Sequence, residues 1–335
     1  MDTQRLRKIT QQFNGKTVMV LGDFVADEYI LGKTSRISRE APVLILQYAS
    51  RQIVLGGAGN ATANLAALGA TVIPAGVIGD DETGREVTRH LKQLGVDTSL
   101  LLVQRGRVTT TKTRIMAGGR HQHTSQQQVV RIDRGEFDSS WAESEEKFLS
   151  ALDEKLNHVD ALVVSDYQYG VLSPRMIGKV NQIAKRGQRI ITVDSRYRML
   201  SFHGVTAVTP NEPEVEESLG IRLDDSEEAV RAAGEKILER VESKAVLITR
   251  GSKGMALIES GGKAEFLPVF GTDEIADVTG AGDTVIAIFT LALAGGATLP
   301  EAAQLANIGG GIVVMKRGTA TVSCKELESA LRKPS

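Results

Sequence analysis

The chain has 335 residues, 41% of them hydrophobic, and its 40 Lys and Arg nearly balance its 41 Asp and Glu. This balance excludes a protein that coats a polyanion, so we expect no nucleic-acid partner. The single cysteine, Cys324, excludes an intramolecular disulfide and a zinc site built on thiolates, and is typical of a cytoplasmic protein. The N-terminus has no apolar leader core, and the longest apolar run, residues 285–294, is about half a membrane span, so we expect neither secretion nor membrane insertion.

Short aliphatic runs alternate along the chain with segments in which apolar residues recur every three or four positions. The runs predict buried parallel strands at 18–22, 71–77, 161–165, 189–194 and 245–249. The periodic segments predict amphipathic helices at 59–68, 82–94, 141–156, 174–185 and 226–239, and the apolar run 285–294 predicts a further helix. Alternation of strand and helix predicts an α/β fold with a mostly parallel central sheet.

Two stretches, 29–49 and 108–133, break this alternation. Thr109, Thr111 and Thr113 alternate with other residues, a pattern typical of antiparallel strands. Each stretch leaves the core and returns, so we expect one domain over residues 1–335 with a small β-flap as a candidate lid. An apolar face at Val43, Ile45 and Leu46 would need covering, which predicts a homodimer formed through two flaps.

Residues 277–284 read Asp-Val-Thr-Gly-Ala-Gly-Asp-Thr and stand directly before the apolar run. Glycines before a helix leave backbone N–H groups free to bind an anion, and the helix dipole favours that binding. Asp283 would lie in the first turn, where a carboxylate beside a phosphate can act as general base for an attacking hydroxyl. Helix capping is the alternative.

Residues 56–60, Gly-Gly-Ala-Gly-Asn, open another expected helix. Glycine permits close approach of a ligand to the backbone, and the Asn60 amide can bond sugar hydroxyls. A packing turn between flap and helix is the alternative. Asp23 follows the strand 18–22, and open α/β sheets bind ligands at the carboxyl ends of their strands. A turn cap explains Asp23 equally well.

Two further segments suit a nucleotide. Asn211 is a plausible cap for a helix, and Glu214 close to it could hold water around Mg²⁺. Residues 249–254, Thr-Arg-Gly-Ser-Lys-Gly, follow a strand and form a tight turn that suits a nucleotide phosphate or ribose, with Gly254 at its end. An ordinary hairpin is the alternative for this turn.

With these residues assembled, the chain resembles the ribokinase-type (PfkB) carbohydrate kinases over residues 16–331. Residues 277–283 match the C-terminal signature of that family, and residues 56–60 match its N-terminal one. The resemblance implies a ribokinase-like three-layer α/β sandwich, ATP as phosphoryl donor, Mg²⁺, and K⁺ near Asp277 and Gly318. It implies Asp283 as base with an anion hole at Gly280, Ala281 and Gly282, sugar contacts from Asp23, Gly57 and Asn60, magnesium and phosphate contacts from Asn211 and Glu214, and nucleotide contacts from Thr249, Gly251 and Asn307.

Within this family the chain is similar to the kinases of D-glycero-β-D-manno-heptose 7-phosphate. The similarity is carried by residues 34–38, 40–43, 164–167 and 277–285, although Arg39 stands where we expect proline. It implies phosphorylation of the anomeric oxygen during ADP-heptose and lipopolysaccharide-core synthesis. Because the chain ends at Ser335, just past the region of resemblance, we expect the stand-alone kinase without a fused adenylyltransferase domain.

The distal phosphate of such a substrate needs a cation, because a dianion would enter beside Asp23 and Asp283. Lys112 and Arg114 on the flap are the candidates, and a solvated strand face is the alternative for either. Two other functions stay open: another PfkB sugar or sugar-phosphate kinase, and a catalytically silent sugar-phosphate-binding homologue. An intact glycine string with Asp283 disfavours the silent protein.

Overall fold

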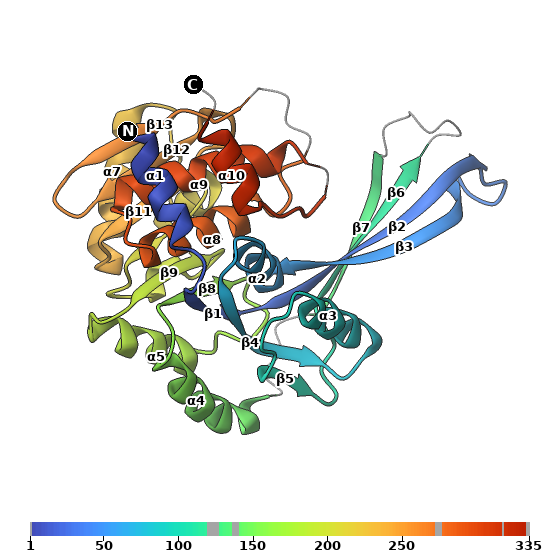
Figure 1. The fold of residues 1–335 in the computed structure, drawn as a ribbon. Coiled ribbons are helices and arrows are strands. Elements are labelled where there is room, and N and C mark those ends of the chain that lie inside the picture. The colour runs from blue at the N-terminus through green and yellow to red at the C-terminus, as the bar shows by residue number, and fades with distance from the viewer. Residues whose placement is uncertain (1, 119–126, 136–140, 272–276, 317, 333–335) are drawn as a thin grey trace.

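The fold is built on a central sheet of nine strands in the computed structural model, which describes residues 2–118, 127–135, 141–271, 277–316 and 318–332 (Figure 1). In spatial order the strands are β13 (Ala264–Leu267), β12 (Met255–Glu259), β11 (Ala245–Thr249), β10 (Ala207–Val208), β9 (Ile190–Ser195), β8 (Ala161–Asp166), β1 (Thr17–Gly22), β4 (Thr71–Gly79) and β5 (Leu100–Gln104). All neighbours from β11 to β5 pair in parallel, and β12 and β13 add an antiparallel edge.

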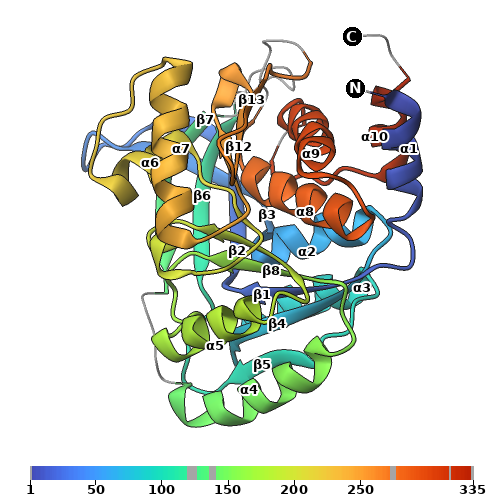
Figure 2. The same cartoon turned by 90° about the vertical axis from the view of Figure 1, so that its left-hand side faces the viewer.

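Helices cover both faces of this sheet, which makes three layers (Figure 2). Successive strand residues point to opposite faces, so Val18 and Val20 pack into one core while Met19 and Leu21 pack into the other. The first core includes residues of α1 (Thr3–Gln11), α2 (Ala58–Ala67), α3 (Glu82–Gln93), α8 (Ala281–Ala294), α9 (Leu299–Val314) and α10 (Cys324–Ala330). The second includes residues of α4 (Ala142–Leu156), α5 (Pro174–Lys185), α6 (Glu212–Leu219) and α7 (Glu227–Val241). Short 3₁₀ turns occur at Met199–Ser201 and Gly251–Lys253.

A second, four-stranded sheet projects from the body of the molecule (Figure 1). Its spatial order is β3 (Leu44–Gly57), β2 (Phe24–Ile37), β6 (Thr111–Gly118) and β7 (Gln127–Arg134). The β2 residues next to the body are buried and those toward the tip are increasingly exposed. We call this sheet the flap. Its root lies against the central sheet, so side chains at the root of β6 can reach the ends of β1 and β8.

The expected fold class is confirmed, with all five expected parallel strands in one sheet. The sequence analysis missed four short members of that sheet, β5, β10, β12 and β13, and the helices α1, α9 and α10. The first flap segment was placed too narrowly at 29–49. It runs from Phe24 to Gly57, because β2 and β3 stay paired down to the end of β1. Residues 119–126 of the second expected segment lie outside the described residues.

The second flap segment also starts later than expected. Thr109 was expected in a strand, but β6 begins at Thr111. The Thr109 hydroxyl donates instead to Asp81 Oδ1 (2.7 Å) and accepts from the Gly79 amide (2.9 Å). These bonds attach residue 109 to the β4–α3 turn, which explains why strand pairing begins two residues later.

Candidate active site

Asp283 lies in the first turn of α8, a helix that is buried on nearly all sides. A helix that is apolar all round belongs inside a protein, and this burial leaves the Asp283 side chain almost inaccessible to solvent. Gly280 forms the N-cap in a left-handed conformation with φ of 78° and offers no capping side chain. The start of α8 therefore carries exposed peptide groups beside a buried carboxylate.

The expected anion hole is only partly free. The Ala281 N–H donates to the Val278 carbonyl (3.2 Å), so the fold already uses it. The N–H groups of Gly280, Gly282 and Asp283 have no hydrogen-bond acceptor within the described residues. Two of the three expected groups, Gly280 and Gly282, are therefore able to bind an anion at the helix start, and the Asp283 N–H takes the place of Ala281.

Two donors hold the Asp283 carboxylate. The Asn60 amide donates to Oδ2 (2.9 Å), and the Tyr167 hydroxyl donates to Oδ1 (3.1 Å). Burial raises the pKa of Asp283 to about 7, with a further rise from Asp27, while these two hydrogen bonds and the Lys112 ammonium lower it. A carboxyl group with such a pKa can accept a proton at neutral pH, as a general base must.

Asn60 is brought to Asp283 by the start of α2. Its amide also donates to the Gly280 carbonyl (3.2 Å), and its Oδ1 accepts from Asn64 (3.2 Å). Gly57 precedes this helix with φ of 56°, and a Cβ there would lie 2.7 Å from the Asp23 carbonyl and 3.2 Å from the Tyr167 ring. The segment 56–60 thus packs tightly and also reaches the site.

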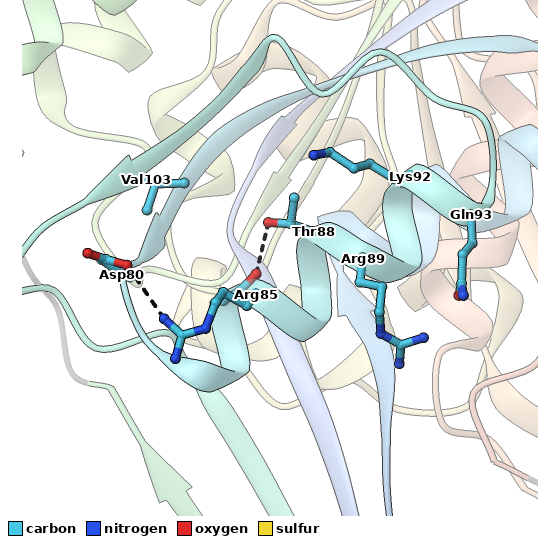
Figure 3. A pocket seen from close by; sticks show the side chains of 9 residues that line it. Asp80, Arg85, Thr88, Arg89, Lys92, Gln93 and Val103 are labelled. Atoms are coloured by element: carbon cyan, nitrogen blue, oxygen red, sulfur yellow. Dashed lines mark hydrogen bonds and ion pairs between the residues drawn. The ribbon is translucent and has the colours of Figure 1, made fainter.

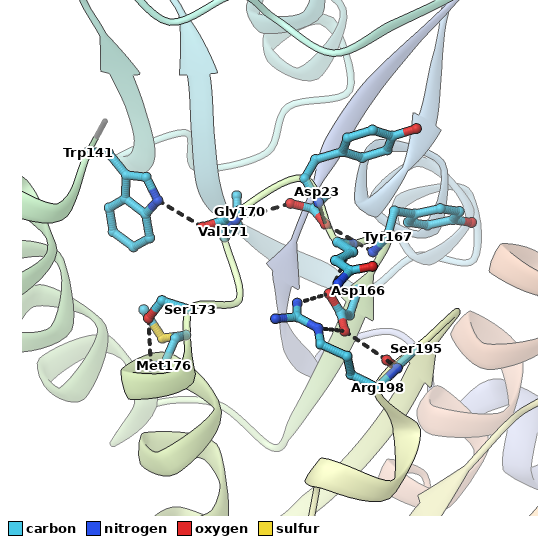
Figure 4. A network of polar contacts seen from close by, with 12 residues as sticks. Asp23, Trp141, Asp166, Tyr167, Gly170, Val171, Ser173, Met176, Ser195 and Arg198 are labelled. Atoms are coloured by element: carbon cyan, nitrogen blue, oxygen red, sulfur yellow. Dashed lines mark hydrogen bonds and ion pairs between the residues drawn. The ribbon is translucent and has the colours of Figure 1, made fainter. Parts of the chain in front are cut away.

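Asp23, at the end of β1, organises the loop that follows β8 (Figure 4). Its Oδ2 accepts from the N–H groups of Tyr167 (2.9 Å) and Tyr169 (3.1 Å), and its Oδ1 accepts from that of Val171 (3.2 Å). Burial, with the nearby Asp166, raises the pKa of Asp23 to about 6. The turn-capping alternative therefore describes the contacts that the structure shows for this side chain.

The neighbouring Asp166 carries an ion pair of its own (Figure 4). It accepts from the Arg198 guanidinium and from the Ser195 hydroxyl (2.7 Å). These bonds join the ends of β8 and β9 and thereby fix the position where the loop begins.

The two expected flap cations differ in their surroundings. Arg114 is ion-paired with Asp27 and lies over the Tyr29 ring (5.4 Å). Lys112 makes no ion pair or hydrogen bond within the described residues. Its Nζ lies 4.9 Å from the centre of the Tyr167 ring and 5.8 Å from that of Tyr169. Burial lowers the pKa of Lys112, so its charge is costly where it stands.

Two further carboxylates, Glu214 and Asp194, lie near Asp283. Asn211 and Glu214 form a capping box at the start of α6, with bonds of 2.9 Å and 3.0 Å between side chain and backbone. Burial raises the pKa of Glu214, and burial followed by Glu214 and Asp283 raises that of Asp194 well above its usual value. A Cβ at Gly282 would lie 3.8 Å from Asp194 Oδ2, which places Asp194 beside the start of α8.

The residues expected on the nucleotide side lie at the end of β11 and near it. Thr249 pairs with Asn211 through an isolated bridge. Gly251 and Gly254 have φ of 55° and 82° in the turn that leads into the antiparallel strand β12, so the hairpin alternative describes its local geometry. A Cβ at Gly254 would lie 2.0 Å from the Leu267 carbonyl. Asn307 donates to the adjacent Pro268 carbonyl (2.7 Å), so it lies close to this turn.

Asp277 links the start of the glycine string to the C-terminal segment. Its Oδ1 accepts from the Thr279 amide (2.9 Å) and its Oδ2 from the Gly318 amide (3.0 Å). Although burial raises the pKa of Asp277, these bonds and Arg114 bring it below its usual value.

The structure therefore gathers Asp283, Asn60, Gly57 and Asp23 at one place, with Lys112 above them and Glu214 beside them. The sequence analysis assigned no role to Tyr167 or Asp194. Tyr167 directly follows β8, and Asp194 lies at the end of β9. Both strands were expected and end at the same edge of the sheet as Asp23, so this position in the sequence could have indicated a functional role. Across the described ranges, no group of three or more His, Cys, Asp and Glu side chains is arranged to hold a metal ion.

A cavity of about 670 Å³ lies elsewhere, between α3 and β5 (Figure 3). Arg85, Arg89, Lys92 and Val103 are among its lining residues, and Arg85 pairs with Asp80 at 3.6 Å. None of the candidate site residues lines it. Among the described helices, none combines the length and apolarity that crossing a bilayer requires.

Solved structures share this fold. An Arabidopsis thaliana ribokinase complexed with ribose and ATP superposes with a TM-score of 0.73 at 19% identity, covering 96% of this chain and 100% of that one. Escherichia coli phosphofructokinase-2 in complex with potassium gives a TM-score of 0.71 at 18% identity over 94% of this chain and 98% of that one. The architecture is therefore the ribokinase-like α/β sandwich.

Residues 16–326 match the profile of the pfkB family carbohydrate kinases. The chain therefore belongs to this family of carbohydrate kinases. Among curated relatives, the bifunctional protein HldE of Geobacter sulfurreducens is 36% identical over 332 residues, and that of Paramagnetospirillum magneticum is 39% identical over 324 residues. These alignments cover 99% and 96% of this chain but 66% and 64% of the two relatives.

Proposed function

We propose that this kinase transfers the γ-phosphoryl group of ATP to the anomeric oxygen of D-glycero-β-D-manno-heptose 7-phosphate, giving the 1,7-bisphosphate. The observation that carries this proposal is Lys112, a mostly buried cation with no anionic partner within the described residues and within electrostatic reach of Asp283. Such a cation suits an acceptor that already bears a phosphate. The sequence resemblance to heptose 7-phosphate kinases selects the sugar, and ADP-heptose and lipopolysaccharide-core synthesis is the proposed context.

In this proposal Asp283 takes the proton of the acceptor hydroxyl. The acceptor oxygen forms a bond to the γ-phosphorus, the bond from that phosphorus to the bridging oxygen breaks, and the electron pair leaves with ADP. The free N–H groups of Gly280 and Gly282 stabilise the charge on the transferring group, with Ala281 shaping the turn between them. Asn60 keeps the carboxylate oriented toward the acceptor.

On the sugar side, Gly57 lets the acceptor approach the backbone and Asp23 contributes in two ways. Its three backbone contacts hold the loop at 167–171, and Oδ1, with a single partner, keeps acceptor capacity for a sugar hydroxyl. Lys112 meets the distal phosphate. Arg114, already paired with Asp27, supports the flap root and acts on the phosphate at longer range.

On the nucleotide side, Thr249, Gly251, Gly254 and Asn307 contact ATP around the end of β11. Asp194 and Glu214, two half-buried carboxylates near one another, fit a divalent cation. A bound charge would relieve the burial that raises both pKa values and the repulsion from Glu214 that raises that of Asp194. Glu214, and Asp194 with it, would hold Mg²⁺ through water beside Asn211. When bound, Mg²⁺ neutralises charge on the transferring phosphates. K⁺ near Asp277 and Gly318 completes the proposed set.

We further propose a homodimer formed through the flaps and a cytoplasmic location, where ATP is available. Val43 and Leu44 are exposed on the flap by 56% and 43%, and Ile45 and Leu46 are half-buried. Arg39, in the exposed β2–β3 turn, lies close to this face.

The test is a direct competition. Heptose 7-phosphate, fructose 6-phosphate, ribose and adenosine are offered with Mg-ATP at equal concentrations, and the position of the new phosphate is determined by phosphorus NMR. We expect the highest kcat/KM for heptose 7-phosphate and an anomeric phosphate. A higher kcat/KM for another sugar would leave the broader sugar-kinase function, and no turnover on any acceptor would favour the silent homologue.

A further inference from the structure

Tyr167 occupies the centre of the site and is held in place by the backbone around it. It is the first residue after β8, in the loop whose N–H groups bind Asp23 (Figure 4). Its ring also packs close to Gly57, where an added Cβ would come within 3.2 Å of Cε2. The direction of the Tyr167 hydroxyl is therefore set by the fold rather than by rotation of a free side chain.

That hydroxyl contacts the base itself. It donates to Asp283 Oδ1 at 3.1 Å, while the Asn60 amide binds Oδ2 at 2.9 Å. One donor on each oxygen fixes the plane of the carboxylate. Because burial, followed by Asp283, raises the pKa of Tyr167 well above its usual value, the hydroxyl keeps its proton throughout the neutral range and acts as a donor.

The same ring contacts the flap. Lys112, on β6, places its ammonium 4.9 Å from the ring centre and has no carboxylate partner within the described residues. A cation over a phenol ring attracts its π electrons and makes the hydroxyl a stronger donor. Asp27 and Asp133 on the neighbouring strands also favour the charge of Lys112, but neither forms an ion pair with it. A cation without an ion pair is displaced by an anion at lower cost than one held in an ion pair.

We propose that Tyr167 is a positioning residue that couples the flap to the base, with its hydroxyl orienting Asp283 and its ring carrying Lys112. This inference rests on the proposed role of Asp283. When an anionic group of the acceptor draws Lys112 off the ring, the hydroxyl donates more weakly and Asp283 becomes the stronger base. The base is thereby activated when a phosphorylated acceptor is in place.

The first test compares Tyr167→Phe with Tyr169→Phe, using the acceptor of highest wild-type kcat/KM. Tyr169 is the matched control, because its ring also lies near Lys112 while its hydroxyl bonds to no group in the described residues. We expect Tyr167→Phe to lower kcat about tenfold, to leave the Kd of ATP unchanged, and to shift the acid limb of the pH profile of kcat/KM upward by about one unit. We expect Tyr169→Phe to leave that limb in place. Every assay uses the same acceptor, so the titration of the acceptor itself affects all pH profiles equally and does not contribute to the differences between variants.

Incorporation of 3-fluorotyrosine at position 167 covers the case in which Tyr167→Phe does not fold. The fluorinated hydroxyl is a stronger donor of nearly unchanged size, so the acid limb should move to lower pH, opposite to Tyr167→Phe. Equal profiles for the two phenylalanine variants, or no movement with 3-fluorotyrosine, would overturn the positioning role.

The flap link is tested by adding Lys112→Met to each background. If Lys112 acts through the ring, its effect on the acid limb is smaller in Tyr167→Phe than in the wild type. Equal effects in both backgrounds would overturn the link. Asp283→Asn is assayed alongside, and near-normal turnover of that variant would refute the proposed base. If Asp283→Asn is inactive but the acid limb of Tyr167→Phe stays at the wild-type pH, the role of Asp283 stands and this inference alone is refuted.

Discussion

Replacing Asp283 by asparagine separates the catalytic role of this carboxylate from its cost to the fold. The pKa of Asp283 is about 7 against an ordinary 3.8, because the side chain is buried. A rise of about three units corresponds to about 4 kcal/mol of destabilisation when the group is charged. The asparagine side chain removes that charge at nearly the same size.

The hydrogen bonds around residue 283 can be kept in the variant. The asparagine oxygen can accept from Asn60, and its NH₂ group can donate to the Tyr167 oxygen, since a hydroxyl both donates and accepts. No buried polar group is then left without a partner. We therefore expect Asp283→Asn to be more stable than the wild type at pH 8, by up to about 4 kcal/mol and several degrees in Tm.

This gain depends on pH in a defined direction. The folded state holds the Asp283 proton more tightly than the unfolded chain, so this group makes the wild type less stable as pH rises from about 4 to about 7. The Tm difference between variant and wild type should be largest at pH 8 and should nearly vanish at pH 4. Turnover at pH 8 should fall by about 10²–10⁴-fold while ATP affinity is retained.

Calorimetric melts at pH 4, 6 and 8, with steady-state kinetics and ATP titration at pH 8, check both parts. A Tm difference that does not change with pH would refute the assigned burial cost. Near-normal turnover of Asp283→Asn would refute the base.

Four further outcomes are expected. Asp23→Ala leaves three loop N–H groups without their acceptor and should lower the free energy of unfolding by about 3–5 kcal/mol in urea titrations; a loss below about 1 kcal/mol would contradict it. Lys112→Ala should raise the KM of the sugar phosphate much more than that of ATP, whereas Arg114→Ala should mainly lower Tm, and equal effects on the two KM values would contradict the division. EDTA should abolish turnover, and K⁺ should stimulate it relative to tetramethylammonium; unchanged rates in either comparison would refute that ion's role. Light scattering should show a dimer that Val43→Asp dissociates, and a fully active monomeric wild type would exclude it.

Local signals in the sequence were enough to predict the layered α/β fold. The five predicted parallel strands are aliphatic runs and most of the predicted helices have an apolar period of three or four residues, so both are visible in short windows of chain. The glycine string before α8 and the glycines before α2 were visible for the same reason, since the conformation at a helix start is decided by a few adjacent residues. Short strands such as β10 and β13 were missed because two to four residues carry no period.

What each polar side chain contacts was decided by the tertiary structure. Asp23 and Tyr167 are 144 positions apart, and Tyr167 and Asp283 are 116 apart, yet each pair is hydrogen-bonded. In the sequence Lys112 and Arg114 are indistinguishable, as alternate residues of one strand. In the structure Asp27 on β2 forms an ion pair with Arg114, and Lys112 has no ion pair within the described residues. The order of strands in the sheet brings distant strand ends to one edge, and burial there raises the pKa values of the carboxyl groups. Neither the strand order nor the burial is encoded in any local stretch of the chain.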